Sequence, residues 1–220
     1  GVEAAGLQPR LDLRAQARHA HRQFVASPRR FAQPEGNGRR GALRVFHAHA
    51  PGFDASVWEI WPYLTAGASV HIPDEEIRMR PKQLAAWLRQ ESITLSFLPT
   101  PLAEAMLESA HGNLHGMALR ALLTGGDRLH RSWTGLPFAL MNHYGPTESS
   151  VVATWCKVES ESGQPPIGRP IANTRVHVLD RLGHLASVGV PGEFCIAGDG
   201  LARGYWRRPE LTAERFVTTA

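Results

Sequence analysis

Cysteine is scarce in this sequence of 220 residues, which has only Cys156 and Cys195. Two cysteines in a chain of this length do not make the disulfide framework of a small secreted protein, so a reducing cytoplasm is the expected setting. The two cysteines form no CxxC pair, and none of the 11 histidines belongs to an HExxH pattern. The sequence therefore shows neither of these zinc-binding spacings.

Long apolar runs are also missing. No segment reaches the roughly 18 apolar residues of a membrane-spanning helix, so we expect no membrane partner. The first residues, GVEAAGLQPRLDLRAQARHA, lack the apolar centre of a signal peptide and do not start with Met. They are typical of a cut end or a fragment.

Lysine is nearly absent, and the positive charge is confined to one end of the chain. Only Lys82 and Lys157 are lysines, so arginine supplies the other cations. Residues 1–50 hold nine arginines and three acidic residues, whereas residues 51–220 are slightly acidic. Clustered arginines could bind nucleic acid, but no aromatic interleaving or binding motif accompanies them, so we do not expect a nucleic-acid partner.

The rest of the composition is that of a globular protein, with 43% hydrophobic and 20% charged residues. Residues 1–44 are basic and rich in turn-forming residues, so we expect a flexible segment there. Residues 45–160 alternate short apolar strands with helices, which predicts an α/β core with a mostly parallel sheet flanked by helices. Residues 161–220 are β-rich and predict a smaller second subdomain.

Local patterns predict the individual elements. Two of the predicted helices have a side chain that can cap their first turn. Asp54 or Ser56 could cap the helix that starts near residue 54, and Thr100 could cap the helix that starts near residue 100. The loops of interest leave the carboxyl ends of the predicted strands, where parallel sheets bind ligands. Strands are expected near 43–50, 68–73, 92–99, 119–124 and 138–142, and helices from 54, over 81–91 and from 100.

The segment NHYGPTESS, residues 142–150, is unusual for a loop. Gly145 permits unusual backbone angles, and Pro146 fixes its own. Three side chains beside this turn offer a flat ring, a hydroxyl for a phosphate oxygen and a carboxylate that suits Mg²⁺: Tyr144, Thr147 and Glu148. Together they indicate a nucleotide site. From spacing alone, a rigid turn whose glutamate merely caps the next helix is an equally good interpretation.

Two other patterns are weaker. Gly125 and Gly126 follow a strand in TGGD and would let a base or ribose approach the backbone, although an ordinary strand-to-loop turn explains them better. Asp54 could be the counter-ion of a ligand amine, and Trp58 lies four residues later on the same helix face. On the sequence alone, helix capping by Asp54 and core packing by Trp58 are favoured.

Four longer motifs occur in order: FDASVWEIWPYL, NHYGPTE, PPIGRPIANTRVHVLD and GEFCIAGDGLARGYWRRPELTAERFV. Together they closely resemble the adenylation domain of nonribosomal peptide synthetases, within the superfamily of adenylate-forming, AMP-binding enzymes. The resemblance covers about residues 45–218. It implies the large domain of such an enzyme, in which the β-rich second part forms a distorted barrel.

The resemblance also implies an activity. Members of the family are ligases that use ATP and Mg²⁺ to convert an amino acid into an aminoacyl adenylate and pyrophosphate. They then pass the acyl group to the phosphopantetheine thiol of a carrier domain. The implied partners are the peptidyl carrier and condensation domains of one assembly line, in secondary metabolite biosynthesis.

By the same resemblance, several residues acquire roles around the nucleotide. Tyr144 would stack on adenine, with Gly125 and Gly126 as the opposite wall of the slot. Thr147 would contact the α-phosphate and Glu148 would hold Mg²⁺, which makes these two the expected catalytic residues. The full nucleotide-binding set is Gly125, Gly126, Asn142, Tyr144, Gly145 and Thr147.

A pocket for the amino acid is implied beside the nucleotide, with Asp54 pairing with its α-ammonium group. Apart from His143, the lining is apolar, and burying an aliphatic side chain there would contribute roughly 1.5–3 kcal/mol. It resembles the family's leucine-type pocket, which usually has Asn where His143 stands. Leucine or a similar aliphatic residue is therefore expected, since one methylene separates substrates by only about 1–3 kcal/mol. The lining comprises Ala55, Trp58, Phe97, Leu123, Gly125, His143, Val151 and Val152.

The chain also departs from the family pattern. A Ser/Thr/Gly-rich phosphate loop ending in Lys-Gly is missing before FDAS, and no Tyr-Arg-Thr-Gly-Asp segment or C-terminal domain with its catalytic lysine is present. We therefore expect a core fragment that is inactive on its own. Two alternatives stay open: an acyl- or aryl-CoA synthetase, against which Asp54 argues, and a non-catalytic remnant with a basic arm.

Overall fold

The computed structural model describes residues 43–217, apart from 48, 50–51, 111–112 and 160–162. The flexible segment predicted for residues 1–44 therefore lies almost entirely outside the described residues. Within the described ranges, no helix combines the length and the apolar character needed to cross a bilayer.

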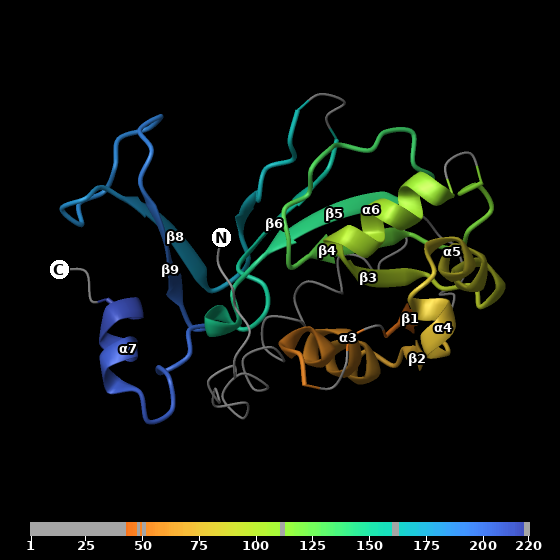
Figure 1. Cartoon of the computed structure of the whole chain (residues 1–220), viewed down its shortest axis with the longest axis horizontal. Coiled ribbons are helices and arrows are strands. Elements are labelled where there is room, and N and C mark those ends of the chain that lie inside the picture. The colour runs from red at the N-terminus through yellow and green to blue at the C-terminus, as the bar shows by residue number, and fades with distance from the viewer. Residues whose placement is uncertain (1–42, 48, 50–51, 111–112, 160–162, 218–220) are drawn as a thin grey trace.

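The predicted α/β core is confirmed, and its centre is one seven-stranded sheet (Figure 1). Its strands lie in the order β2-β1-β3-β4-β5-β6-β7. The first five in this order are parallel, and the last two pair antiparallel. In chain order the strands are β1 (Arg44–Phe46), β2 (Ser69–His71), β3 (Leu95–Pro99), β4 (Ala121–Gly125), β5 (Ala139–Tyr144), β6 (Thr154–Lys157) and β7 (Arg169–Pro170).

Helices cover both faces of this sheet (Figure 1). α3 (Asp54–Thr65) lies on one face, while α5 (Pro81–Gln90) and α6 (Thr100–Ser109) lie on the other, and the short α4 (Glu75–Arg78) precedes α5. Because successive strand residues point to opposite faces, the central strands are apolar on both. Leu123 of β4 packs in the cluster with α3, whereas its neighbour Leu122 packs in the cluster with α5 and α6.

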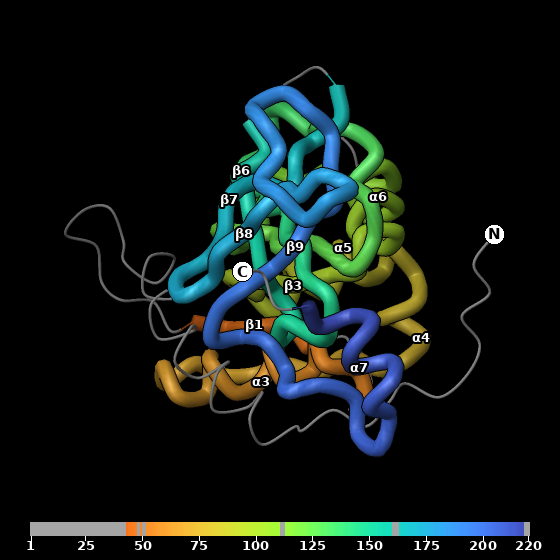
Figure 2. Tube along the Cα trace, turned by 90° about the vertical axis from the view of Figure 1, so that its left-hand side faces the viewer, coloured from red at the N-terminus to blue at the C-terminus, as the bar shows by residue number. Residues whose placement is uncertain are grey.

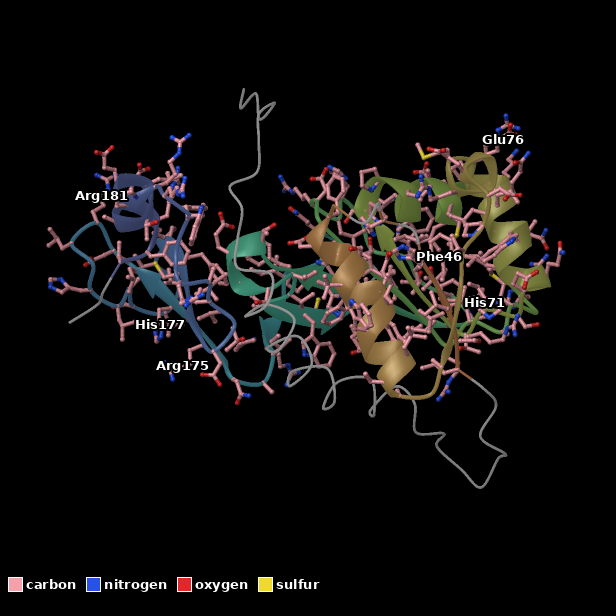
Figure 3. All side chains as sticks on the ribbon, turned by 90° about the horizontal axis from the view of Figure 1, so that it is seen from below. Phe46, His71, Glu76, Arg175, His177 and Arg181 are labelled. Atoms are coloured by element: carbon pink, nitrogen blue, oxygen red, sulfur yellow. The ribbon has the colours of Figure 1, made fainter. Side chains whose placement is uncertain are left out.

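A smaller sheet follows, formed by the antiparallel pair β8 (Thr174–Leu179) and β9 (Glu193–Gly198), with α7 (Pro209–Arg215) after it. Figure 2 shows this pair continuing from β7. In Figure 3, Arg175 and His177 of the smaller sheet lie well apart from Phe46 and His71 of the larger one. The β-rich character expected after residue 160 is thus present, although β7 of the large sheet also lies beyond that residue. The boundaries of the two parts stay a prediction.

The two predicted helix caps are wrong. α3 begins at Asp54 itself, its N-cap is Phe53, and no side chain caps it. α6 begins at Thr100 with Pro99 as N-cap, because the Thr100 hydroxyl instead donates to the carbonyl of Asp127 at 3.1 Å. In both cases the predicted residue occupies the first helical turn rather than the position before it.

Candidate functional site

The residues singled out from the sequence gather at the carboxyl edge of the large sheet. β3, β4 and β5 are parallel and end at Pro99, Gly125 and Tyr144. The loops that leave them therefore start side by side, as expected for a ligand site in an α/β sheet.

The turn after β5 is tightly folded. Gly145 lies so close to the returning chain that a Cβ atom there would be 2.5 Å from the carbonyl oxygen of Val151. The amide of Ala153 donates to the carbonyl of Tyr144 at 2.8 Å, which closes the turn. Inside it, η1 (Thr147–Ser149) forms one turn of 3-10 helix. Only glycine fits at position 145, so the turn holds Tyr144 and Glu148 in a fixed relation.

A loop from beyond the small sheet contacts this turn at Glu148. The Tyr205 hydroxyl donates a hydrogen bond to the Glu148 carboxylate, and the amide of Ala202 donates to the Glu148 carbonyl at 2.8 Å. The Ser150 hydroxyl donates to the carbonyl of Gly200, also at 2.8 Å. Burial and the neighbouring Glu148 raise the pKa of Tyr205 to about 12. No separate sequence pattern pointed to Tyr205, which lies inside a longer motif.

A cleft of about 370 Å³ opens beside the turn. Its walls include Gly126, which has a φ of +85°, and Gln164, Pro165 and Ile167 also line it. The Asn142 side chain is buried and donates to the carbonyl of Pro166 at 2.8 Å. Four predicted nucleotide residues meet in this cleft: Gly126, Asn142, Tyr144 and Gly145.

Tyr144 is 39% exposed at the cleft, and its ring makes a T-shaped contact with Phe194 of β9, with 5.6 Å between the centroids. One ring face is therefore not needed to fill the core and can meet a flat ligand. Gly125 stands beside the next strand, where a Cβ would lie 2.7 Å from the His143 carbonyl oxygen. Any larger residue would push β4 and β5 apart.

Most of the residues predicted to line the amino-acid pocket pack in a second cluster, on the face of the sheet that α3 covers. His143 connects its members, with ring centroids 5.8 Å from Trp58 and 6.4 Å from Phe97. Val151 is only partly buried and has a φ of +77°. The buried members are Ala55, Trp58, Phe97, Leu123, Gly125, His143 and Val152.

Among these buried pocket members, His143 is the residue whose side chain can carry a charge. Its Nδ1 atom is buried and makes no hydrogen bond of normal geometry. Burial lowers the pKa of His143 to about 4, although the peptide groups of Met141 and Thr124 offset part of this effect. The imidazole is therefore neutral at pH 7 and adds no charge to this apolar cluster.

Asp54 is the first residue of α3 and directly precedes Ala55 of the same cluster. It is half-buried and stands one turn before Trp58. A carboxylate in the first turn of a helix is stabilised by the helix dipole by about 0.3–1 kcal/mol. Asp54 therefore stands where a carboxylate can meet a cation.

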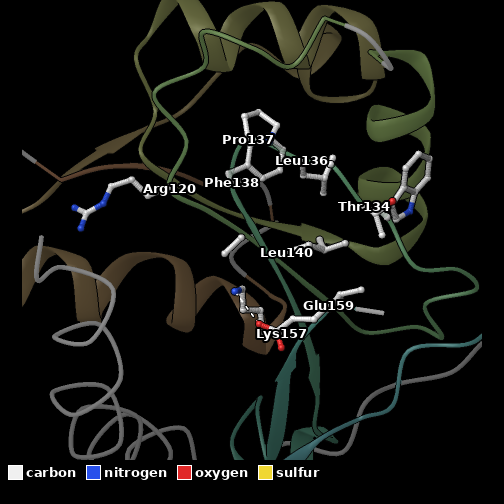
Figure 4. A pocket seen from close by; sticks show the side chains of 12 residues that line it. Arg120, Thr134, Leu136, Pro137, Phe138, Leu140, Lys157 and Glu159 are labelled. Atoms are coloured by element: carbon white, nitrogen blue, oxygen red, sulfur yellow. Dashed lines mark ion pairs between the residues drawn. The ribbon is translucent and has the colours of Figure 1, made fainter. Parts of the chain in front are cut away.

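A larger cleft, of about 600 Å³, lies at the opposite edge of the sheet, where β4 and β5 begin (Figure 4). Arg120, Lys157 and Glu159 line it together with apolar residues of the 133–140 segment, and Lys157 pairs with Glu159 at 2.8 Å. None of the predicted site residues lines it.

The donor set suits Mg²⁺ rather than a metal held by protein ligands alone. No group of three or more His, Cys, Asp or Glu able to hold a metal occurs among the described residues. Glu148 is half-buried and follows Thr147 in η1, two residues after Pro146, which lines the cleft. Mg²⁺ is usually held by one or two carboxylates, waters and the phosphates of the substrate, so the residues present fit it.

Several known proteins are similar to this chain in sequence. Residues 17–206 match the family described as AMP-binding enzyme. A linear gramicidin synthase of Brevibacillus parabrevis is 56% identical over 169 residues, which are 75% of this chain and 2% of that protein. Bacitracin synthase 1 of Bacillus licheniformis is 46% identical over 165 residues, which are 75% of this chain and 3% of that protein. The chain thus spans a very small part of these curated relatives.

Two solved structures share the fold. A crystal structure of the nonribosomal peptide synthetase FmoA3 superimposes with a TM-score of 0.79 and 28% identity, over 92% of this chain and 22% of that one. A four-domain nonribosomal peptide synthetase bound to AMP and glycine gives a TM-score of 0.72 and 31% identity, over 81% of this chain and 14% of that one.

Proposed function

The chain belongs to the AMP-binding enzyme family, among the adenylation domains of nonribosomal peptide synthetases, and we propose on that basis that it selects an aliphatic amino acid and converts it into an aminoacyl adenylate. One observation carries the proposal. His143 and Tyr144 are consecutive in β5, so their side chains point to opposite faces. The His143 ring packs against Trp58 of the apolar cluster, and both His143 and Tyr144 line the cleft, so neighbouring residues of one strand serve the proposed acyl pocket and the proposed nucleotide slot.

In this proposal the cleft of about 370 Å³ takes the adenine. Tyr144 stacks on the base, and the backbone of Gly125 and Gly126 forms the opposite wall. Asn142, already held by its bond to Pro166, borders the amino edge of the ring. Gly145 keeps the turn compact enough for the ribose side of the nucleotide.

Thr147 and Glu148 act at the phosphates. The Thr147 hydroxyl donates a hydrogen bond to an α-phosphate oxygen, and the Glu148 carboxylate holds Mg²⁺. When bound, Mg²⁺ neutralises charge on the phosphate oxygens. The contribution of these residues is mainly to position the α-phosphorus for in-line attack and to stabilise the developing charge.

The amino acid lies with its side chain in the α3-facing cluster. Asp54 binds its α-ammonium group, which leaves the carboxylate directed toward the α-phosphorus. We propose leucine or a related aliphatic amino acid, because the wall of Ala55, Trp58, Phe97, Leu123, Gly125, Val151 and Val152 offers no charged partner. Neutral His143 completes the wall, at the position where leucine-type pockets of the family usually have an asparagine.

Two steps follow from this arrangement. An oxygen of the amino-acid carboxylate attacks the α-phosphorus of ATP, the bond to the pyrophosphate oxygen breaks, and pyrophosphate leaves. The phosphopantetheine thiol of a peptidyl carrier domain then attacks the acyl carbonyl, and AMP leaves. Carrier and condensation domains of one assembly line are therefore the proposed partners, in the cytoplasm, in secondary metabolite biosynthesis.

The 220 residues by themselves are proposed to catalyse little or no adenylation. They contain the pocket, Tyr144 and Glu148, but no Ser/Thr/Gly-rich loop to hold the triphosphate. Strong leucine-dependent exchange by residues 1–220 alone would refute this part of the proposal, without touching the pocket assignment.

The test of the activity is ATP–pyrophosphate exchange by the whole protein that carries this chain, with a panel of amino acids. We expect leucine, isoleucine or valine to stimulate exchange, and aspartate and lysine to give only background. Exchange driven by a charged amino acid would contradict the pocket assignment. Absence of exchange with every amino acid would contradict the function itself.

A further inference from the structure

Three titratable side chains form a cluster next to the α3-facing apolar residues: Glu59 and His47 are buried, and His49 is half-buried. Glu59 of α3 is completely buried, and both of its carboxylate oxygens have partners. His47 Nδ1 lies 2.7 Å from Oε2, and His49 Nδ1 lies 2.7 Å from Oε1. The backbone amide of His49 also donates to Oε2, at 3.0 Å.

This arrangement defines which ring nitrogens carry hydrogen. A carboxylate only accepts, so both Nδ1 atoms face Glu59 as donors. Burying a carboxylate costs several kcal/mol unless it is paired and hydrogen-bonded. Two imidazoles and one amide meet this need for Glu59, and removing its partners would leave a buried charge uncompensated. The three residues are therefore held in one geometry.

The cluster joins two elements that build the pocket. Glu59 follows Trp58 directly on α3, one turn after Ala55, and those two residues belong to the pocket wall. On the other side, the His49 ring lies 5.5 Å from the ring of Phe97, which is the wall contributed by β3. The hydrogen bonds of Glu59 thus fix α3 relative to the chain that leaves β1 and, through His49, relative to Phe97.

We propose that Glu59, His47 and His49 form a positioning cluster that sets the separation of Trp58 and Phe97, and thereby determines which aliphatic side chain the pocket admits. Its effect on selectivity rests on the proposed function, whereas its effect on the geometry does not. None of the three residues touches the reacting atoms. Their role is to hold the two aromatic side chains at a fixed separation. That separation matters because a pocket lined by apolar residues distinguishes aliphatic side chains by their size.

Glu59→Gln is the first test, because it keeps the shape of the side chain and removes its charge. Glu91→Gln is the matched control. Glu91 also pairs with a histidine and an arginine at the sheet edge, with Oε2 3.6 Å from His71 Nδ1 and 3.3 Å from an Arg44 nitrogen. It lies outside the pocket cluster. Both variants are made in the 220-residue chain, and melting by circular dichroism checks folding.

The readout that needs no ligand is the amide and indole NMR spectrum. In Glu59→Gln we expect the signals of Ala55, Trp58 and Phe97 to shift, while Glu91→Gln leaves them in place. A merely stabilising role would lower the melting temperature and leave these signals unchanged. Shifts confined to residues 47, 49 and 59 would overturn the proposal.

The ligand readout is calorimetric titration with leucine, isoleucine and valine. We expect Glu59→Gln to bind leucine roughly tenfold more weakly, a difference of about 1.4 kcal/mol, and to bind the three amino acids with less contrast than the wild type. Unchanged affinities and contrast in a folded variant would overturn the selectivity claim. If the wild-type chain bound no amino acid, the proposed function would fail, while the NMR comparison would still decide the positioning role.

A second variant covers the case in which Glu59→Gln does not fold. His49→Asn keeps a nitrogen donor for Glu59 and removes the ring that faces Phe97. We expect the Phe97 signals to shift and leucine binding to weaken in a protein with a near-normal melting temperature. A folded His49→Asn protein with wild-type signals and affinities would contradict the proposal.

Discussion

His143 should make the stability of the protein depend on pH between about 4 and 6.5, and His143→Asn should remove that dependence. Burial lowers the pKa of His143 in the folded state to about 4, from an ordinary 6.5. Between these values the unfolded chain binds a proton that the folded chain does not. Stability therefore rises with pH across this window and is lost on acidification.

The magnitude follows from the two pKa values. A shift of this size makes the wild type roughly 2 kcal/mol less stable at pH 4.5 than at pH 7 through His143 alone. Asparagine has no proton to gain, so His143→Asn lacks this loss. The substitution preserves a polar side chain of moderate size at the pocket wall, and leucine-type pockets of the family usually have asparagine there. We therefore expect the variant to retain leucine binding.

Urea denaturation of both proteins at pH 7 and pH 4.5 measures the effect. The difference between the two pH values should be roughly 2 kcal/mol larger for the wild type than for His143→Asn. Other titrating groups contribute to both proteins and cancel in the comparison. Equal pH dependence would refute the argument that His143 is buried and neutral in the folded pocket.

The remaining predictions concern the ligand groups. Asp54→Asn should weaken leucine binding, because the α-ammonium loses its counter-ion, without altering ATP binding; calorimetry with each ligand checks both. Glu148→Gln in the whole protein should greatly lower exchange at every Mg²⁺ concentration, and wild-type turnover would remove Glu148 from its proposed role. Tyr205→Phe should raise the Mg²⁺ concentration needed for half-maximal exchange, since the hydroxyl no longer orients Glu148; an unchanged requirement would argue against that contact. Gly145→Ala should lower the melting temperature by several degrees, because its Cβ would collide with the Val151 carbonyl.

The sheet and its helices could be predicted because their patterns are local. The runs LSFLP and ALLTG are apolar on both faces, as only the central strands of a covered parallel sheet are. Leu84 and Leu88 stand one turn apart and define the buried side of α5. The elements missed were short: four residues in α4, four in β6 and two in β7 carry too little periodicity to be recognised.

The site could be predicted only in part. The pocket residues of α3, β3, β4 and β5 were located by motif, and the structure brings them into one cluster, although their roles remain proposals. The contacts of Glu59 with His47 and of Glu148 with Tyr205 were not foreseen. They join positions 12 and 57 residues apart, and no local pattern reports such a pairing. The predicted cap at Thr100 was wrong for the same reason, since the Thr100 hydroxyl donates to the carbonyl of Asp127, which is 27 residues away in the sequence.

The most direct test of the account is ATP–pyrophosphate exchange by the whole protein with leucine and with 4-methylpentanoate. The two acids share the side chain and the carboxylate, and only leucine has the α-ammonium group that Asp54 is proposed to bind. We predict exchange with leucine and little with 4-methylpentanoate, and in Asp54→Asn we predict that leucine loses most of this advantage. Equal exchange with both acids in the wild type would contradict amino-acid activation and favour an acyl ligase instead.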